Sequence, residues 1–287
     1  MKLYLTFLTI IITNSSCYAQ SKIIFGEVKD SKTKQVLKYV SIGILNKSVG
    51  TVSDSNGRFT IKLNEKVLNT DTLIFSSIGY VTKKYTISDL SDINLIELYP
   101  EEKYLADVLV KSTKRKPKII GRNNKGLGLM HLNFYTAYEK TIDDRLSKEI
   151  GMKFRIKKDC KISDLNFNVT SNDFKLVKFR LNFYTIENGF PTNLFIEKNI
   201  VFEIKDQFLG WYNLDLKSFQ LYLGKENEEI AVTIQWIESQ KKNEKSKYFA
   251  ISTAMSATEH SFYREKAMDK WLKSGQSLSF YLNAMCK

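Results

Sequence analysis

Short runs of alternating apolar and polar residues, separated by turn residues, extend from Lys22 to the C-terminus. A period of two places successive side chains on opposite faces of a strand, so each run predicts a β-strand with one buried face. One such run, Phe59 to Leu63, directly follows Asp54-Ser55-Asn56-Gly57. Because Asn-Gly tolerates positive φ, this turn is a strong β-hairpin signal. The pattern predicts an all-β protein.

Composition supports folded domains. The 287 residues are 43% hydrophobic, which excludes wholesale disorder. The 13 Gly and 3 Pro are too few for a collagen-like or low-complexity chain. The length fits two domains of ordinary size.

The first nineteen residues predict export. Met1-Lys2 precedes the apolar run Leu3 to Ile12, which is too short to span a bilayer as a mature helix. Small residues at Cys17 and Ala19 then predict a signal peptide, residues 1–19, cleaved after Ala19. The alternative is lipidation of Cys17, although Asn14 stands where a lipoprotein signal has Leu. No later apolar stretch approaches the roughly 18 residues of a transmembrane helix, so the mature chain is expected in the periplasm or associated with the cell surface or outer membrane.

Residues 20–100 predict a small β-sandwich of short, evenly spaced strands. Four segments occur in a characteristic order: Gly26 to Asp30, Val40 to Ile42, Gly50 to Phe59 and Ser77 to Tyr80. In them, residues 23–98 resemble the carboxypeptidase-like regulatory domain, a transthyretin-like sandwich found beside peptidases and at the N-termini of TonB-dependent outer-membrane receptors. The resemblance implies structural roles for the Asn-Gly turn and for Gly79-Tyr80. It does not imply transport, because no receptor barrel follows.

Residues 101–131 predict a connecting segment. Leu105 to Val110 resembles the strand that follows this domain in receptors, and Lys111 to Lys118, with five basic residues in eight, predicts a linker. Residues 132–287 predict a jelly-roll-like sandwich of about eight antiparallel strands, with a short helix over Arg264 to Lys273. This part loosely resembles jelly-roll modules of exported bacterial proteins through Phe183-Tyr184-Thr185, Gly189-Phe190-Pro191 and Gly210 to Leu216. Some modules of that architecture bind carbohydrate.

The net charge of +13 does not predict nucleic-acid binding. The basic residues of Lys111 to Lys118 and Lys241 to Lys247 form loop-like clusters rather than a stripe interleaved with aromatic residues. A solvated linker and a solvated hairpin tip are the favoured interpretations. Contact with anionic envelope material is the alternative.

The sequence offers little material for catalysis. Neither His131 nor His260 has a partner at zinc-ligand spacing, and no nucleophile elbow or phosphate-binding loop is present. Asp54 could begin a calcium loop ending at Glu65, but the strand pattern between them favours a turn. We therefore expect no metal, no cofactor and no enzymatic activity.

Two groups of residues remain as candidate sites. Trp211, Tyr212 and Trp236 could stack on sugar rings, or they could belong to the core. Cys160 and Cys286, 126 positions apart, could form a disulfide in an oxidising compartment, or they could be two buried thiols. The sequence thus predicts an exported, non-enzymatic cell-envelope module that binds an envelope protein or glycan. A carbohydrate-binding accessory protein and an unrecognised hydrolase are the alternatives.

Cell fractionation tests the predicted export. A form lacking residues 1–19 is expected in the envelope or external fraction, because signal peptidase acts after the small residue Ala19. Intact-mass analysis of that fraction locates the cleavage. Recovery of an uncleaved cytoplasmic form would contradict the prediction.

Overall fold

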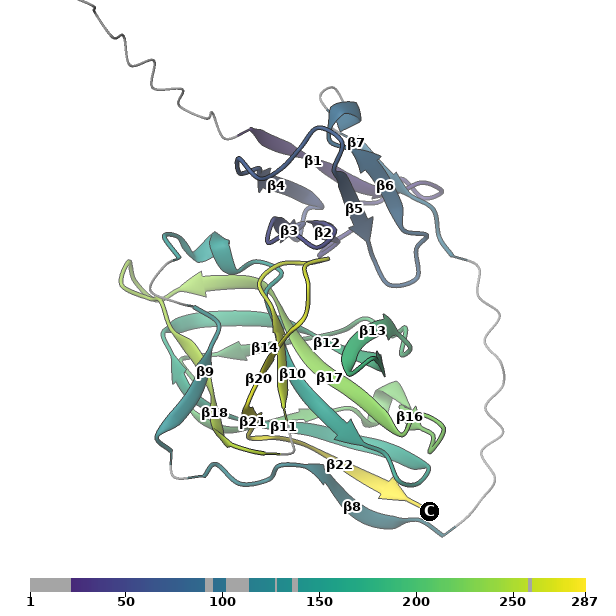
Figure 1. The fold of residues 1–287 in the computed structure, drawn as a ribbon, viewed down its shortest axis with the longest axis vertical. Helices are drawn as coiled ribbons and strands as arrows, with labels where there is room; N and C mark the ends of the chain where they lie inside the picture. The colour runs from purple at the N-terminus through teal and green to yellow at the C-terminus, as the bar shows by residue number, and fades with distance from the viewer. Residues whose placement is uncertain (1–21, 91–94, 102–113, 127, 136–138, 258–259) are drawn as a thin grey trace, which may run out of the picture.

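The computed structural model describes residues 22–90, 95–101, 114–126, 128–135, 139–257 and 260–287. The regular secondary structure in these residues is almost entirely β-strand (Figure 1). The predicted all-β fold class is confirmed. The predicted signal peptide and the predicted strand at Leu105 to Val110 lie outside the described residues. None of the described helices has the length and apolar character needed to cross a membrane.

The N-terminal unit is a sandwich of two sheets around its own core (Figure 1). The three-stranded sheet has the order β4 (Arg58–Lys62), β1 (Ile23–Asp30), β7 (Leu95–Leu98). The four-stranded sheet has the order β3 (Gly50–Val52), β2 (Ser41–Ile44), β5 (Thr72–Ser76), β6 (Lys83–Thr86), and η1 (Ser88–Leu90) follows it. Strands β3 and β4 are therefore both edge strands.

The turn at Asp54 to Gly57 links the two sheets instead of closing a two-stranded hairpin. The Asp54 carboxylate accepts hydrogen bonds from the backbone N–H of Asn56 at 2.8 Å and of Arg58 at 2.9 Å. Gly57 has φ of 75°, in the left-handed region that favours glycine. The predicted turn chemistry is present, but β3 pairs with β2 whereas β4 pairs with β1. The Asp54 side chain stabilises the turn in the manner of an Asx-turn.

The C-terminal unit is a larger sandwich with an aromatic-rich core. One sheet has the order β13 (Phe190–Leu194), β12 (Phe174–Glu187), β17 (Glu229–Lys241), β10 (Glu149–Arg155), β19 (Ser261–Arg264), β20 (Leu272–Ser274), with β14 (Ile200–Lys205) also paired to β12. The other has the order β21 (Gln276–Leu278), β18 (Phe249–Met255), β11 (Cys160–Asn172), β22 (Phe280–Cys286), β8 (Lys116–Gly121), with β15 (Gly210–Asp215) and β16 (Tyr222–Leu223) paired to β11 and β9 (Met130–Asn133) paired to β18. Short 3-10 turns, η2 (Ile142–Arg145) and η3 (Lys217–Phe219), interrupt the strands.

Two segments differ from the sequence prediction of a linker. Residues 116–121, which begin in the basic stretch and continue beyond it, form β8 and pair antiparallel with β22. Residues 130–133 form β9 and pair with β18. The charge of this stretch is compatible with an edge strand, since Lys116 is exposed there and lysines on an edge discourage pairing with other chains.

The predicted helix over Arg264 to Lys273 is wrong. Arg264 ends β19, Leu272 begins β20, and the residues between them form a loop with Met268 at φ of 63°. The loop conformation is held by contacts to other parts of the chain, including the Ala267 N–H, which donates to Ser147 Oγ at 2.9 Å. Tertiary contacts here override local helix propensity.

Cys160 and Cys286 form a disulfide. They lie directly opposite each other at one end of the antiparallel pair β11 and β22. The bond therefore ties the last strand of the chain to the centre of its sheet across a separation of 126 residues.

Removing the disulfide should destabilise the folded state. By the loop-closure model, Cys286→Ser is expected to lower the free energy of unfolding by about 3–5 kcal/mol. Urea unfolding of the oxidised wild type and the variant measures the difference. The double variant Cys160→Ser/Cys286→Ser is the control, because reductant should destabilise the wild type and leave the double variant unchanged. Equal stability of the oxidised wild type and the variant would contradict the prediction.

Candidate functional site

The three predicted platform aromatics do not share a face. Trp236 is 0% exposed and lies in the core, so its assignment to a sugar platform is wrong. Tyr212 packs against Phe202 and Phe167 on the core side of β15, and its hydroxyl donates to the Glu203 carbonyl at 3.0 Å. Since side chains alternate along a strand, the neighbouring Trp211 points to the other face. Trp211 is 36% exposed, whereas Tyr212 is partly buried.

Trp236 contacts a cation instead of a ligand. Its ring lies 4.7 Å from the guanidinium of Arg145, which is also 4.3 Å from the ring of Tyr135 and 5.0 Å from that of Phe174. Arg145 is 0% exposed. Aromatic faces attract a desolvated guanidinium, so Trp236 has a structural role that its place in the strand pattern could not reveal.

A row of four polar residues crosses the sheet on the face opposite the core. In register, Arg180 of β12 pairs with Gln235 of β17, Gln235 with Glu149 of β10, and Glu149 with Arg264 of β19. We call these four residues the polar row. Arg180, Gln235 and Glu149 are all buried, at 4%, 1% and 0% exposure. The alternation of apolar and polar residues predicts that this polar face contacts water, but in the structure the face is buried.

Glu149 is the centre of the row. Its carboxylate accepts hydrogen bonds from Arg264 Nε at 2.9 Å and Nη2 at 2.6 Å, and from Asn182 Nδ2 at 2.8 Å. The hydroxyls of Tyr184 and Thr233 also donate to it. Burial disfavours the charge on Arg264, but the charge and hydrogen bonds of Glu149 together with the charges of Tyr184 and Asp269 outweigh burial and raise the pKa of Arg264. Desolvation raises the pKa of Tyr184, which stays a neutral donor.

The N-terminal unit provides the cover over Arg180. The guanidinium donates through Nη2 to the Tyr39 carbonyl at 2.5 Å and through Nη1 to Ser41 Oγ at 3.4 Å. Tyr39 has φ of 57°, an uncommon value for a residue other than glycine, so the surrounding contacts must hold it there. Its hydroxyl donates to Glu238 Oε2 at 2.7 Å. One residue of the N-terminal unit thus binds the larger unit through both its backbone and its side chain.

A second contact joins β2 and the residues after it to the loop between β19 and β20. A Cβ on Gly43 would lie 2.0 Å from the Ala267 carbonyl oxygen, so the close approach of the two units requires glycine here. The Asn46 N–H donates to the Met268 carbonyl at 2.9 Å, and Ser48 Oγ donates to Asp269 at 2.6 Å. These contacts explain why residues 265–271 form a loop that fits the N-terminal unit.

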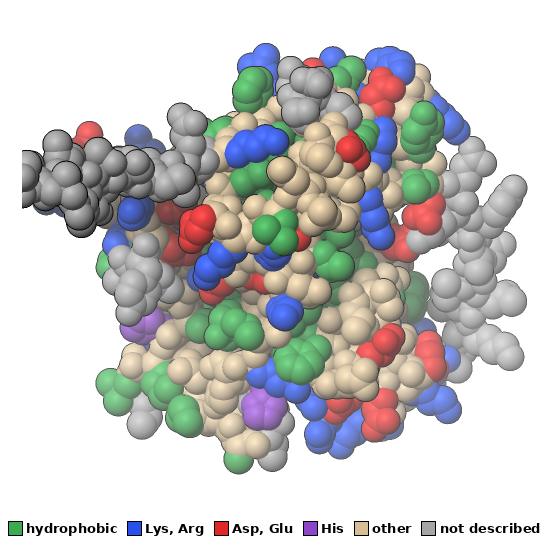
Figure 2. Space-filling view, turned by 45° about the horizontal axis from the view of Figure 1, so that its top comes forward, with side chains coloured by type: hydrophobic (Ala, Val, Ile, Leu, Met, Phe, Trp, Pro, Cys, Tyr) green, Lys and Arg blue, Asp and Glu red, His purple; other side chains and the backbone are tan. Residues whose placement is uncertain are grey.

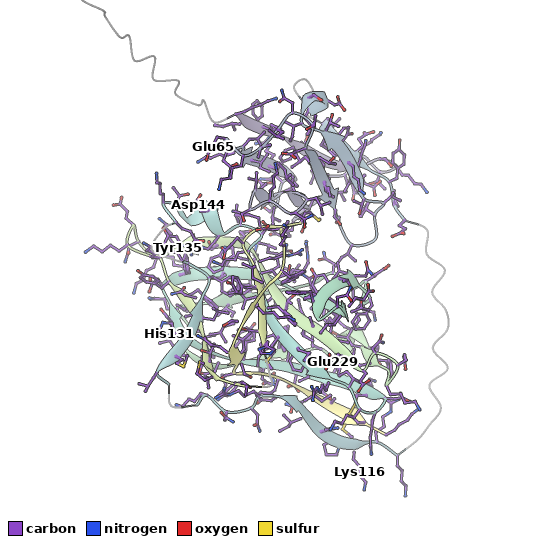
Figure 3. All side chains as sticks on the ribbon, in the orientation of Figure 1. Glu65, Lys116, His131, Tyr135, Asp144 and Glu229 are labelled. Atoms are coloured by element: carbon purple, nitrogen blue, oxygen red, sulfur yellow. A yellow bond between two sulfur atoms is a disulfide. The ribbon has the colours of Figure 1, made fainter. Side chains whose placement is uncertain are left out.

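A cleft of about 430 Å³ opens between the two units. One wall is made by the edge strands β3 and β4, and the other by Asp144, Leu146 and Lys266. Figure 3 shows Asp144 on the side of the larger unit that faces the N-terminal unit. Removal of water from around the Lys266 ammonium lowers its pKa from 10.5 to about 8, although Asp144 opposes this shift. The ammonium donates to the Leu146 carbonyl at 3.2 Å.

The sequence predicts neither the buried polar row nor the cleft. Glu149, Arg180 and Asn182 occupy polar positions of alternating runs, where the default interpretation is a solvated face. The only local signal is a charged residue directly before the apolar run that begins at Ile150. Lys266 lies in the segment whose sequence predicts a helix, and that helix does not form.

The described residues present no group of three or more His, Cys, Asp and Glu side chains that could hold a metal ion. On the face drawn in Figure 2, basic and acidic side chains are interspersed. The basic excess therefore does not gather into one stripe on this face.

Comparison with known proteins identifies the N-terminal unit. Residues 24–110 match the model of the CarboxypepD_reg-like domain family, as the resemblance predicts. This is a non-catalytic domain family typical of envelope proteins. No curated protein matches the sequence. A solved structure of the infectious bursal disease virus Gt strain is similar at 9% identity and a TM-score of 0.25, with 92% of this chain and 64% of that chain covered. The chain thus spans less than two thirds of that viral chain, and so low a score supports no inference.

The lowered pKa of Lys266 predicts a pH-dependent stability. The pKa of Lys266 is about 8 in the folded state, whereas a fully solvated lysine side chain has a pKa of 10.5. The unfolded state therefore binds more protons between these two pH values. The free energy of unfolding of the wild type should therefore rise, relative to Lys266→Met, as pH increases through this window. Urea titrations at several pH values measure it. Lys270→Met, at an exposed position of the same loop, is the control and should parallel the wild type. A constant difference between wild type and Lys266→Met would contradict the prediction.

Proposed function

We propose that this protein is an exported, non-enzymatic binding protein of the cell envelope, and that it holds an extended segment of a partner protein in the cleft between its two units. The observation that supports the proposal most directly is the cleft itself. Its volume of about 430 Å³ lies in the range of ligand-binding clefts, roughly 300–1,000 Å³.

The walls of the cleft suit a polypeptide segment. Both β3 and β4 are edge strands with backbone groups on one side outside their sheets. Such edges bind an added strand through main-chain hydrogen bonds. Along β4, Arg58, Thr60 and Lys62 are exposed and alternate with buried residues. Lys266 and Asp144 offer charges of both signs from the opposite wall.

Two observations support a binding role rather than catalysis. The N-terminal unit matches a non-catalytic domain family. The residues that line the cleft include neither His nor Cys, the commonest base and a common nucleophile of enzymes. The leader sequence supports export, and the domain family supports a location in the envelope.

Site-specific photocross-linking in the producing cells tests the proposal. A photoreactive phenylalanine analogue at position 60, exposed on β4 and lining the cleft, should give a discrete adduct with an envelope protein. The same analogue at Thr82, an exposed position that does not line the cleft, is the control. Thr60→Trp, which fills the cleft, should abolish copurification of the partner and leave thermal stability unchanged. No adduct from position 60, or the same adducts from position 82, would refute the proposal.

A glycan is the second candidate ligand, and its site would be the outer face of the other sheet. Trp211 lies 5.3 Å from Tyr281 in an edge-to-face contact. Beside them, Asn213 donates to Asn166 at 2.8 Å and Asn283 donates to Asp164 at 2.8 Å, which forms a polar ladder next to an exposed ring. Glycan binding that is lost in Trp211→Ala and retained in Thr60→Trp would favour this candidate over the cleft.

A further inference from the structure

A second, smaller cavity of about 50 Å³ lies between the two units, over the polar row. The N-terminal unit contributes Ser41, Ser76 and Ser77 to its lining, and the C-terminal unit contributes Arg180, Asn182 and Arg264. We call it the arginine cavity. None of these six residues lines the cleft described above. The arginine cavity is therefore separate from the proposed partner-binding cleft.

The charge around the arginine cavity is not balanced. Arg180 is 4% exposed, yet all its hydrogen-bond acceptors are neutral: the Tyr39 carbonyl, Ser41 Oγ, Gln235 Oε1 and Asn199 Oδ1. The one carboxylate of the polar row, Glu149, is bound by Arg264. The buried guanidinium of Arg180 and the partly buried guanidinium of Arg264 thus face one carboxylate. Burial of a cation without a matching anion is unfavourable, and desolvation accordingly lowers the pKa of Arg180 to about 10.

Some residues that line the cavity carry polar atoms without partners among the described residues. The Ser76 and Ser77 hydroxyls make no hydrogen bond to any described residue, so they are available as donors. Asn182 is 3% exposed, and its Oδ1 is a buried acceptor without a donor. Its Nδ2 donates to Glu149 at 2.8 Å, and this bond sets the orientation of the amide because the reverse would place two oxygens together. The cavity therefore offers several donors, an excess positive charge and one acceptor.

We propose that the arginine cavity binds an oxyanion that keeps a proton, a phosphate group, between the two units. Arg180 supplies the opposite charge, and Ser76 and Ser77 donate hydrogen bonds from the N-terminal unit. Asn182 Oδ1 accepts the hydrogen bond of the protonated phosphate oxygen. A volume of about 50 Å³ holds a few water-sized groups, since one water needs roughly 10–15 Å³, and so it matches a single phosphate group. Because ligands come from both units, the bound anion strengthens their docking.

Calorimetry and thermal unfolding of the full mature chain test the proposal with inorganic phosphate as the probe. Phosphate is expected to bind at one site and to raise Tm above that in sodium chloride of equal ionic strength. Sulfate, which has no proton near neutral pH, should bind about tenfold more weakly because it leaves Asn182 Oδ1 without a donor. Glycerol phosphate shows whether the natural ligand is free phosphate or a phosphate group of a larger molecule. Tighter binding of glycerol phosphate than of inorganic phosphate indicates the larger molecule, and weaker binding indicates the free ion.

Two sets of variants separate binding from folding. Arg180→Gln should abolish phosphate binding, but it also removes the bond to the Tyr39 carbonyl. The double variant Ser76→Ala/Ser77→Ala removes only groups without hydrogen bonds, so Tm without phosphate should match the wild type while affinity falls about tenfold or more. Ser55→Ala, at an exposed position outside the arginine cavity, is the control. Absence of phosphate binding, or equal phosphate affinity in the wild type and the double serine variant, would overturn the proposal.

Discussion

The carboxylate of Glu149 is buried on the face of the larger unit that lies against the N-terminal unit, and the rest of that face must supply its hydrogen-bond donors. A charge without access to water is tolerated only when it is paired and hydrogen-bonded. It accepts hydrogen bonds from Arg264, Asn182, Tyr184 and Thr233, which lie on strands β19, β12 and β17 of the same sheet. Satisfying this group makes the centre of the face polar. The face can then be buried only by a surface that itself offers hydrogen-bonding groups.

The N-terminal unit is such a surface. The Tyr39 carbonyl and Ser41 hydroxyl accept from Arg180, and Gly43 allows the backbone to approach Ala267 closely. The docking is thus mostly polar, with a small apolar cluster of Tyr39, Val52 and Ile237 beside it. Both the cleft and the arginine cavity are lined by residues of the two units and lie where these units meet. The candidate functions therefore depend on how two ordinary β-sandwiches meet.

Predictions that depend on side-chain period were correct, and predictions that depend on contacts with distant residues were wrong. The alternation in β12 correctly predicts that Val177, Phe179 and Leu181 face a core, because burial of apolar surface is decided locally by period. The predictions of a linker in residues 101–131 and of a helix over Arg264 to Lys273 were wrong, because the structure of each segment depends on a distant partner. For the basic stretch that partner is β22, and for the residues after Arg264 it includes Ser147. The alternation of apolar and polar residues along one strand does not show which distant residues will pack against it.

The sequence by itself determined that this chain is all-β, that residues 23–98 resemble a carboxypeptidase-like regulatory domain, and which residues of alternating strands such as β12 face a core. Those properties follow from side-chain period and from turn chemistry, which act between near neighbours. Only the tertiary structure decided that the polar side of the sheet containing Arg180, Gln235 and Glu149 is covered by the N-terminal unit. The reason is that desolvation of a polar residue depends on what packs over it, and here that surface lies more than a hundred residues away in the chain.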